Sequence, residues 1–185
     1  MTIQRYQIAD YLEIKPTNQG GVGIGNDSVF ELMGAGFNTL DENPSAQTDS
    51  KVYINDKAST TTIKSYQTQF PFDSDLIVSE NPIMELYTIG RNHYTGANAE
   101  RDYVRVELFA THTVTGTPAL GANQSAFKAR KFKVAVEVSS FAGAGGETVI
   151  VSGNLNAVGD FIDGYFVIGE PDDPQGIKAN TFHAL

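Results

Sequence analysis

The chain has 185 residues, which is enough to bury roughly 70% of the surface of its unfolded form in one core without disulfides or metal. It carries 13 Lys and Arg against 22 Asp and Glu, and the net charge of -9 argues against a protein that grips nucleic acid through a basic surface. It has no cysteine, which excludes disulfide frameworks, thiol catalysis and zinc–thiolate sites and fits folding in a reducing cytoplasm.

The first residues, MTIQRY, lack the apolar run of a signal peptide. No window of the sequence approaches the ~18 apolar residues of a membrane-spanning helix. We therefore expect one soluble domain that is not exported through a signal peptide and does not enter a membrane.

The N-terminal quarter predicts two strands after a variable beginning. Residues 1–15 have a mixed pattern that fits either a short helix or an extended arm. Residues 17–28 are rich in glycine, but the spacing and the Lys-Ser/Thr pair of a phosphate loop are missing, so we interpret them as a connection. Strands are expected at 29–33 and 37–40, followed by a turn.

The stretch 51–109 predicts a strand pair, a helix and a return strand, around which the rest of the chain is organised. A short strand is expected at 52–54. Residues 60–70 are dense in β-branched and aromatic types, which predicts a long strand that ends at Pro71 because proline has no N–H to donate.

An amphipathic helix is expected after a Ser79 cap, with Ile83, Leu86, Tyr87 and Gly90 on one face. Residues 102–109 then alternate, with Val104, Val106 and Leu108 on one side and Tyr103, Arg105 and Glu107 on the other. This period of two is typical of a strand with two different faces.

The C-terminal half continues in β structure. A long polar loop is expected at 110–126, a long two-faced strand at 127–138, and further strands at 148–155 and 161–168. An irregular tail follows from residue 169. Many strands with a single helix predict a mainly-β fold, a β-sandwich or open barrel with one flanking α-helix.

No catalytic or metal-binding pattern is visible, so we expect no enzyme, no metal and no cofactor. His93, His112 and His183 have no metal-ligand spacing and are interpreted as surface residues. Asp73-Ser74-Asp75 and Asp172-Asp173 lack the Gly and distal Glu of a calcium loop and are interpreted as turns. A Ser-His-Asp triad assembled by the fold stays open, although no G-x-S-x-G motif is present.

Four blocks of the sequence resemble the major tail tube proteins of siphophages, the tail tube protein family. They are residues 32–50 (LMGAGFNTLDENPSAQTDS), 51–73 (KVYINDKASTTTIKSYQTQFPFD), 96–109 (GANAERDYVRVELF) and 127–164, which includes KARKFKVAVEVSSFAGAGGETVIVSGNLNAVGDFIDG. Together they cover over half of the chain. The glycine-rich segment 17–28 and the loop 110–126 depart from the family, and we expect no additional C-terminal immunoglobulin-like domain of the kind that some relatives have.

The resemblance implies a single tail tube domain over residues 1–185, with two roughly orthogonal sheets and a helix at the side. It also implies an N-terminal arm at about 1–28, an extended loop at about 110–126 and a C-terminal arm at about 169–185. Six copies would form a ring, and rings would stack into a hollow tube that conducts phage DNA into the host cell during ejection. Long loops and arms would bridge adjacent rings.

The implied partners are further copies of the chain, the tail-tip and tail-terminator proteins, the tape-measure protein and then double-stranded genomic DNA, held in the lumen without specific binding. The implied location is the virion tail, with assembly in the host cytoplasm. A basic lumen would bind DNA at every ring, whereas carboxylates would let it slide. Net charge and alternation therefore suggest as lumen-facing acids Asp56, Glu107, Glu137, Glu147 and Asp163. The long loop suggests as inter-ring contacts Gly116, Thr117, Pro118, Ala119 and Leu120.

Two other classes stay open. A monomeric β-sandwich carbohydrate-binding module fits the strand content and the eight tyrosines, which can stack on sugars. A tube subunit of a DNA-free phage-tail-like particle would share the fold and the ring without a genome.

Overall fold

The computed structural model describes residues 2–15, 29–114, 125–168 and 180–185. The elements in these ranges are η1 (Arg5–Gln7), β1 (Ile8–Ile14), β2 (Val29–Leu32), β3 (Phe37–Leu40), β4 (Ala46–Lys51), β5 (Thr60–Tyr66), β6 (Gln69–Asp75), α1 (Asn81–Arg91), η2 (Gly96–Asn98), β7 (Glu100–Thr111), β8 (Ser125–Ala142), β9 (Ile150–Ala157), β10 (Ile162–Ile168) and β11 (Thr181–Ala184).

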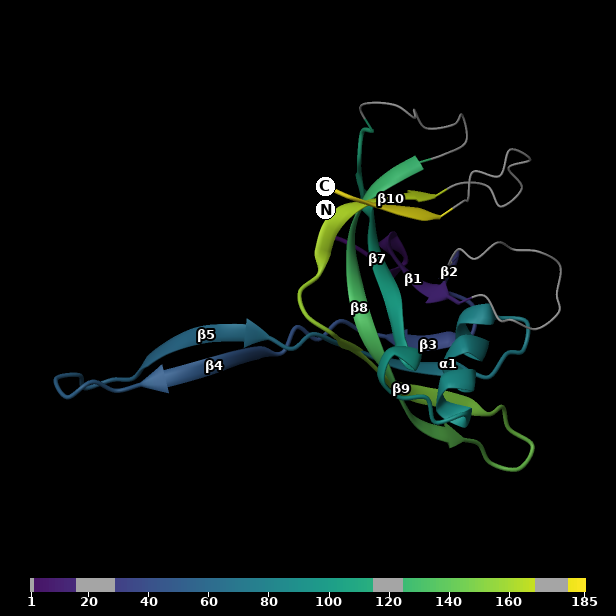
Figure 1. The fold of residues 1–185 in the computed structure, drawn as a ribbon, viewed down its shortest axis with the longest axis horizontal. Helices are drawn as coiled ribbons and strands as arrows, with labels where there is room; N and C mark the ends of the chain where they lie inside the picture. Colours follow the sequence, from purple (N-terminus) through teal and green to yellow (C-terminus); the bar gives the residue numbers. More distant parts are fainter. Residues whose placement is uncertain (1, 16–28, 115–124, 169–179) are drawn as a thin grey trace.

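Nine strands form one curled antiparallel sheet (Figure 1). The order is β2-β1-β7-β8-β9-β6-β3, and β10 pairs with β8 and with β11. β8 is 18 residues long, and its two halves have different neighbours on the same edge. Residues 125–131 pair with β10, whereas residues 134–142 pair with β9. Both portions of the sheet are therefore joined through one strand.

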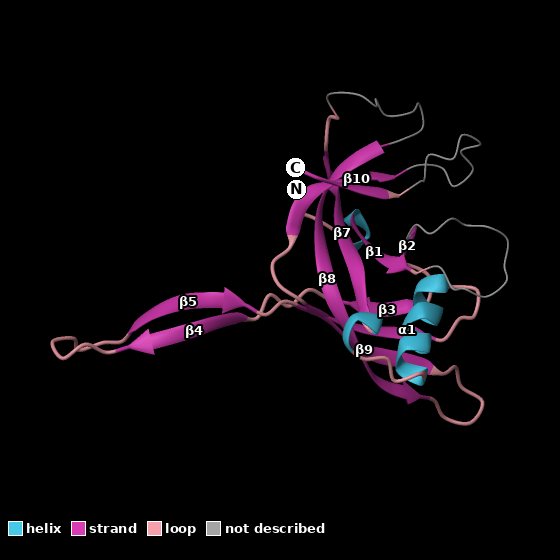
Figure 2. Cartoon of the chain, in the orientation of Figure 1, coloured by secondary structure: helices cyan, strands magenta, loops and turns pink. Residues whose placement is uncertain are grey.

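The mainly-β architecture with one flanking helix, predicted from strand content, is confirmed (Figure 2). β4 and β5 make a second, two-stranded sheet that stands away from the curled one. The N-terminal residues, for which the sequence fitted either a short helix or an extended arm, contain the strand β1. This strand pairs with β2 on one side and with β7 on the other. Its Leu12 is fully buried, so residues 8–14 belong to the sheet and are not an arm.

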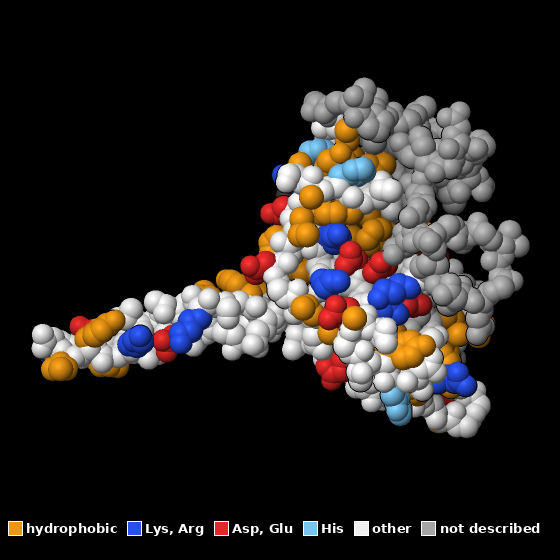
Figure 3. All heavy atoms as spheres, in the orientation of Figure 1, with side chains coloured by type: hydrophobic (Ala, Val, Ile, Leu, Met, Phe, Trp, Pro, Cys, Tyr) orange, Lys and Arg blue, Asp and Glu red, His pale blue; other side chains and the backbone are white. Residues whose placement is uncertain are grey.

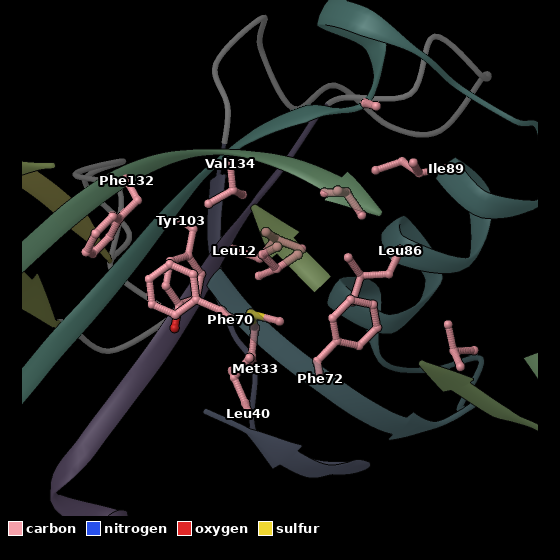
Figure 4. Close-up of a cluster of buried hydrophobic side chains, with 14 residues drawn as sticks. Leu12, Met33, Leu40, Phe70, Phe72, Leu86, Ile89, Tyr103, Phe132 and Val134 are labelled. Atoms are coloured by element: carbon pink, nitrogen blue, oxygen red, sulfur yellow. The ribbon is translucent and has the colours of Figure 1, made fainter. Parts of the chain in front are cut away.

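The larger core fills the concave side of the sheet under α1 (Figure 4). Its centre is aromatic: the Phe70 ring lies 4.5 Å from that of Tyr103 and 4.9 Å from that of Phe132. Leu12 and Leu86 complete it from β1 and α1. Burying each such side chain contributes about 1.5–3 kcal/mol, so this cluster is the main apolar source of stability.

A second core lies at the other end of β8, where Tyr11, Val104, Val106, Ala129 and Phe166 pack together. Their strands alternate so that Val104 and Val106 point opposite to Tyr103. Each end of the long strands thus buries a different face, which explains why both faces of β7 contain buried residues.

The helix begins and ends close to the expected positions, but its cap differs. The N-cap residue is Glu80 and makes no side-chain hydrogen bond, so the expected Ser79 cap is wrong. Pro82 lies in the first turn, where a missing N–H is tolerated. At Gly90 a Cβ would come within 2.8 Å of the Val138 side chain, so glycine permits the close approach of α1 to β8.

The strand pattern between residues 41 and 75 differs from the expectation in three ways. Residues 52–54 lie in the turn between β4 and β5 and not in a strand. The long strand 60–70 is two strands, which belong to different sheets and separate at residues 67–68. Pro71 does not end the pairing, because it lies inside β6 opposite Asn154.

Proline is tolerated there because of where its missing N–H would point. The Asp41 N–H donates to the Pro71 carbonyl. The N–H and the carbonyl of a strand residue point to the same side, so the missing N–H of Pro71 would also face Asp41, just after β3 ends at Leu40. No ladder bond of β3 is therefore lost. Asp73-Ser74-Asp75 was expected as a turn but forms the end of β6, where it pairs with β9. Ser74 is buried, and its hydroxyl donates to the Val151 carbonyl at 3.2 Å.

Candidate functional site

The most distinctive feature is the hairpin of β4 and β5, which projects from the body of the protein (Figure 1). The two strands pair only with each other. Polar contacts hold them: Ser50 and Thr61 share a hydroxyl hydrogen bond of 2.9 Å, and Lys64 Nζ lies 3.1 Å from Asp49. β-Branched Thr60 to Ile63 favour the extended backbone. A two-stranded hairpin is only marginally stable alone in water.

The hairpin also exposes its apolar side chains. Ile54 at the tip is completely exposed, and the others with large exposed fractions are Val52, Tyr53, Ile63 and Tyr66. In Figure 3 the orange apolar atoms of the projecting arm gather toward its far end, and blue and red charged atoms lie nearer the body. Contiguous exposed apolar surface on a soluble protein marks an interaction site.

The charge of the hairpin differs from that of the remaining chain. Residues 46–66 contain two acids (Asp49, Asp56) and three lysines (Lys51, Lys57, Lys64), a net charge of +1. The whole chain carries -9, so the other residues together carry -10. The hairpin and the remaining residues of the chain therefore carry net charges of opposite sign.

The root of the hairpin is fixed to the sheet by ion pairs. Glu42, just after β3, accepts two hydrogen bonds from the Arg130 guanidinium at 2.8 and 2.9 Å. Its second oxygen also lies 3.4 Å from Arg105 Nε. A backbone bridge between Asn43 and Gln69 adds a second anchor. Bidentate arginine–carboxylate pairs fix direction as well as distance, so the hairpin leaves the body at a defined angle.

A row of charges crosses the sheet beneath this root. The register places Asp10 opposite Arg105, Arg105 opposite Arg130, and Arg130 opposite Asp163, on four adjacent strands. Asp10 is 1% exposed and accepts a 2.5 Å hydrogen bond from the Tyr103 hydroxyl. It also pairs with Arg5, whose guanidinium lies within 2.5 Å, and more loosely with Arg105 at 3.7 Å.

The electrostatics of this row follow from burial and pairing. Burial, reinforced by the charge of Asp10, raises the pKa of Tyr103 well above its usual value of 10.0. For Arg130, burial lowers the pKa, but the hydrogen bond and charge of Glu42, with Glu107 and Asp163, raise it overall. Arg105 Nη1 is buried and has no hydrogen-bond partner among the described residues. The row is a tightly coupled structural network.

The five acids expected in one lumen wall lie in separate places. Glu107 and Asp163 flank Arg130, and both carboxylates act on its charge. Glu137 lies on the opposite alternation of β8 and accepts a 2.9 Å hydrogen bond from Asn156. Asp56 is in the exposed turn of the hairpin, and Glu147 is in the exposed turn between β8 and β9.

The residues expected to bridge neighbouring copies, 116–120, lie outside the described residues. The element that does project, the β4–β5 hairpin, was missed because residues 60–70 read as one continuous strand. The signal that could have found it is the polar pair Gln67-Thr68, which separates the threonine-rich run from the buried Phe70 and Phe72.

The three histidines do not form a site of metal-ligand type. His93 is exposed just after α1, whereas His112 and His183 stack on the two sides of Tyr165, with ring centroids at 4.5 and 4.9 Å. No group of three or more metal-ligating side chains occurs within residues 2–15, 29–114, 125–168 and 180–185.

An apolar hollow of about 430 Å³ lies beside η1, between β1, β2, β3 and the outer half of β7. Its apolar lining comes from Ile8, Leu32, Met33, Phe37 and Leu108, and Leu32 is half exposed. Arg5 and Asn38 stand among the lining residues. This hollow has the chemistry of a receptor for an apolar side chain.

Within the described residues, no helix is long and apolar enough to cross a membrane. Compared with protein-family models and with curated proteins, the sequence finds no match.

Proposed function

We propose that this chain is the structural subunit of a bacteriophage-type tail tube, in which hexameric rings stack into a hollow tube that conducts DNA. The observation that carries the proposal is the projecting β4–β5 hairpin, which exposes apolar side chains and contributes nothing to the core of its own chain. Such an arm gains stability only against another molecule. The charge difference between the hairpin and the body favours a second copy as that molecule.

The open strand edges support the same proposal. β2, β3 and β11 each pair on one side only within the described sheet. Unpaired edges invite association with other strands, and an assembly that closes sheets across subunits removes that liability. The partners would be copies of the chain, tail-tip and tail-terminator proteins, and then the tape-measure protein and DNA in the lumen. The site of action would be the virion.

The acidic balance of the chain suits passage of DNA. Repulsion between carboxylates and phosphates keeps a polyanion from adhering to the wall, whereas a basic wall would hold it at roughly 10⁻⁴ to 10⁻⁶ M per site. Glu107 and Asp163 lie near the positive charge of Arg130, so the exposed Glu137 is the strongest candidate for an acid that faces the lumen.

The test is negative-stain electron microscopy of purified protein at rising concentration, with size-exclusion chromatography. We expect hollow rings or tubes with six-fold symmetry. A variant in which residues 47–65 are replaced by a short Gly-Ser link should fold but not stack. The control shortens the exposed turn at residues 143–146 and should assemble normally.

A wild-type protein that stays monomeric at every concentration, with or without an added tail-tip initiator, would refute the tube. Binding of that monomer to a glycan array would instead support the carbohydrate-binding alternative.

A further inference from the structure

We propose that the hairpin tip of one copy, residues 52–57, seats in the apolar hollow beside η1 of a second copy. The inference rests on the proposed function, because it takes a second copy as the partner of the hairpin. It adds the receptor surface, which the tube proposal leaves undefined.

The tip has the chemistry of a knob. Val52, Tyr53 and Ile54 are consecutive, and all three side chains are mostly exposed. The Asp56 N–H donates to the Tyr53 carbonyl at 2.9 Å, so a turn presents these side chains at the end of the arm. Strands rise about 3.3 Å per residue, so β4 alone carries the tip about 20 Å from its root. The hairpin points away from its own body (Figure 1), so its own hollow is not its receptor.

The hollow has the chemistry of the matching hole. Ile8, Met33 and Phe37 form its apolar wall, and Leu32 stands half exposed at the rim. It is more apolar than the hollow between residues 66–69 and 156–160, which is lined largely by Gln, Thr and Asn. An apolar tip therefore fits the first of these better.

Charges around the two surfaces correspond. Asn38 lines the hollow and donates to Asp73 and Asp75 at 3.1 and 3.2 Å, which holds two carboxylates beside it. Lys57, next to the tip, has no ion-pair partner among the described residues. A tip seated in the hollow brings this lysine toward the acidic pair, which favours one orientation of docking.

A knob and a hole on different parts of the same chain make a heterologous contact. Such a contact closes into a ring if its rotation closes and otherwise continues as an open stack, in which the unused knobs and holes lie at opposite ends. This is the symmetry that successive rings of a tube require.

Cysteine cross-linking tests the contact directly, because the native chain has no cysteine. One preparation carries Ile54→Cys and a differently tagged one carries Leu32→Cys; both side chains are exposed, so both variants should fold. A disulfide needs Cα atoms within about 7 Å. On mixing under mild oxidation we expect the hetero-disulfide to form at least ~10-fold faster than with Tyr94→Cys, an exposed residue outside the hollow lining. Equal rates for the two pairs, or no disulfide with either, would overturn the inference.

Charge exchange gives a second readout. Lys57→Asp should weaken association of copies by roughly 5- to 10-fold, and mixing it with Asp73→Lys should restore part of the loss. Absence of any rescue together with equal cross-linking rates would overturn the docking.

The outcomes separate this inference from the proposed function. Selective cross-linking in a protein that forms only short chains of copies, without hollow tubes, would support the docking and refute the tube. Hollow tubes with unselective cross-linking would support the tube and refute the docking.

Discussion

Removing the Asp10 carboxylate should destabilise the protein more than any other single change at the charged row. In Asp10→Ala the Tyr103 hydroxyl loses its acceptor, and Arg105, whose Nη1 already has no partner among the described residues, loses one of its two carboxylate neighbours. Breaking a buried pair by deleting one partner costs about 3–5 kcal/mol. Here Arg105 stays buried with Glu42, 3.4 Å from its Nε, as the remaining carboxylate neighbour. The pair with Arg5 adds little to this, since that arginine is half exposed.

The assay is urea denaturation followed by circular dichroism at neutral pH, with thermal unfolding alongside. For a domain of this size each kcal/mol lowers Tm by roughly 2–4 °C, so we expect a decrease of about 6–20 °C. The Tm of Asp10→Asn should lie between those of the wild type and Asp10→Ala, because its amide oxygen still accepts a hydrogen bond from Tyr103. The exposed Asp41→Ala is the control and should change the free energy of unfolding by less than ~0.5 kcal/mol.

A loss below ~1 kcal/mol in Asp10→Ala would refute the reasoning, because it would mean that water or relaxation already compensates the network. A second variant makes the test sharper. If charge burial is the cause, adding Arg105→Met to Asp10→Leu should recover part of the stability, since both charges leave the interior together.

Three further predictions follow from other parts of the fold. The pKa of Tyr103 is raised in the folded state, so above about pH 10 the folded form keeps a proton that the unfolded form has lost. The free energy of unfolding should therefore decline as the pH rises above about 10. Tyr103→Phe should flatten that decline in urea titrations at different pH values. Gly153→Ala should destabilise by roughly 1–3 kcal/mol in the same assay, because its Cβ would overlap the Glu137 carbonyl oxygen across the β8–β9 ladder; a neutral effect would mean that the strands can separate. Limited trypsin digestion of the monomer should cut first at Lys51 and Lys57 on the exposed hairpin. An earlier cut elsewhere would contradict the exposure of the hairpin. If the hairpin docks, both sites should be protected in assembled material.

Local pattern was sufficient for the elements that pack by alternation. Residues 102–109 and 127–138 alternate between apolar and other residue types in the sequence, and both are strands, although β7 buries residues on both of its faces. The helix was equally clear because its apolar residues recur at three and four, and Ile83 and Leu86 are buried.

Other features depend on partners that are distant in the sequence. Arg105 and Tyr103 were expected only on the less apolar of two strand faces, yet both are buried. Their shared partner Asp10, which lies opposite Arg105 and accepts from the Tyr103 hydroxyl, comes from a strand more than 90 residues earlier. The strand β1 was ambiguous for the same reason: its pairing with β7 cannot be inferred from local periodicity. The hairpin was hidden because its Thr-rich strand has the composition of a sheet strand but no core to face.

Of the candidate site, the sequence supplied the acids but not their grouping. Glu107 and Asp163 come together only because β7 and β10 pair with opposite edges of β8, so both flank Arg130. Strand order determines which charges meet, and strand order is the part of a β fold that composition does not reveal.

The position of β1 has a consequence for synthesis of the chain. Its neighbour β7 ends at residue 111, so roughly 100 residues must be translated after β1 before that pairing can form, which takes about 5–20 s at usual rates. During that interval Tyr11 and Leu12, which lie on opposite faces of β1 and belong to different cores, have neither β7 nor β8 beside them. The nascent chain therefore offers a chaperone an apolar segment near its start, and folding is completed late, when β8, β9 and β10 add their residues to the two cores.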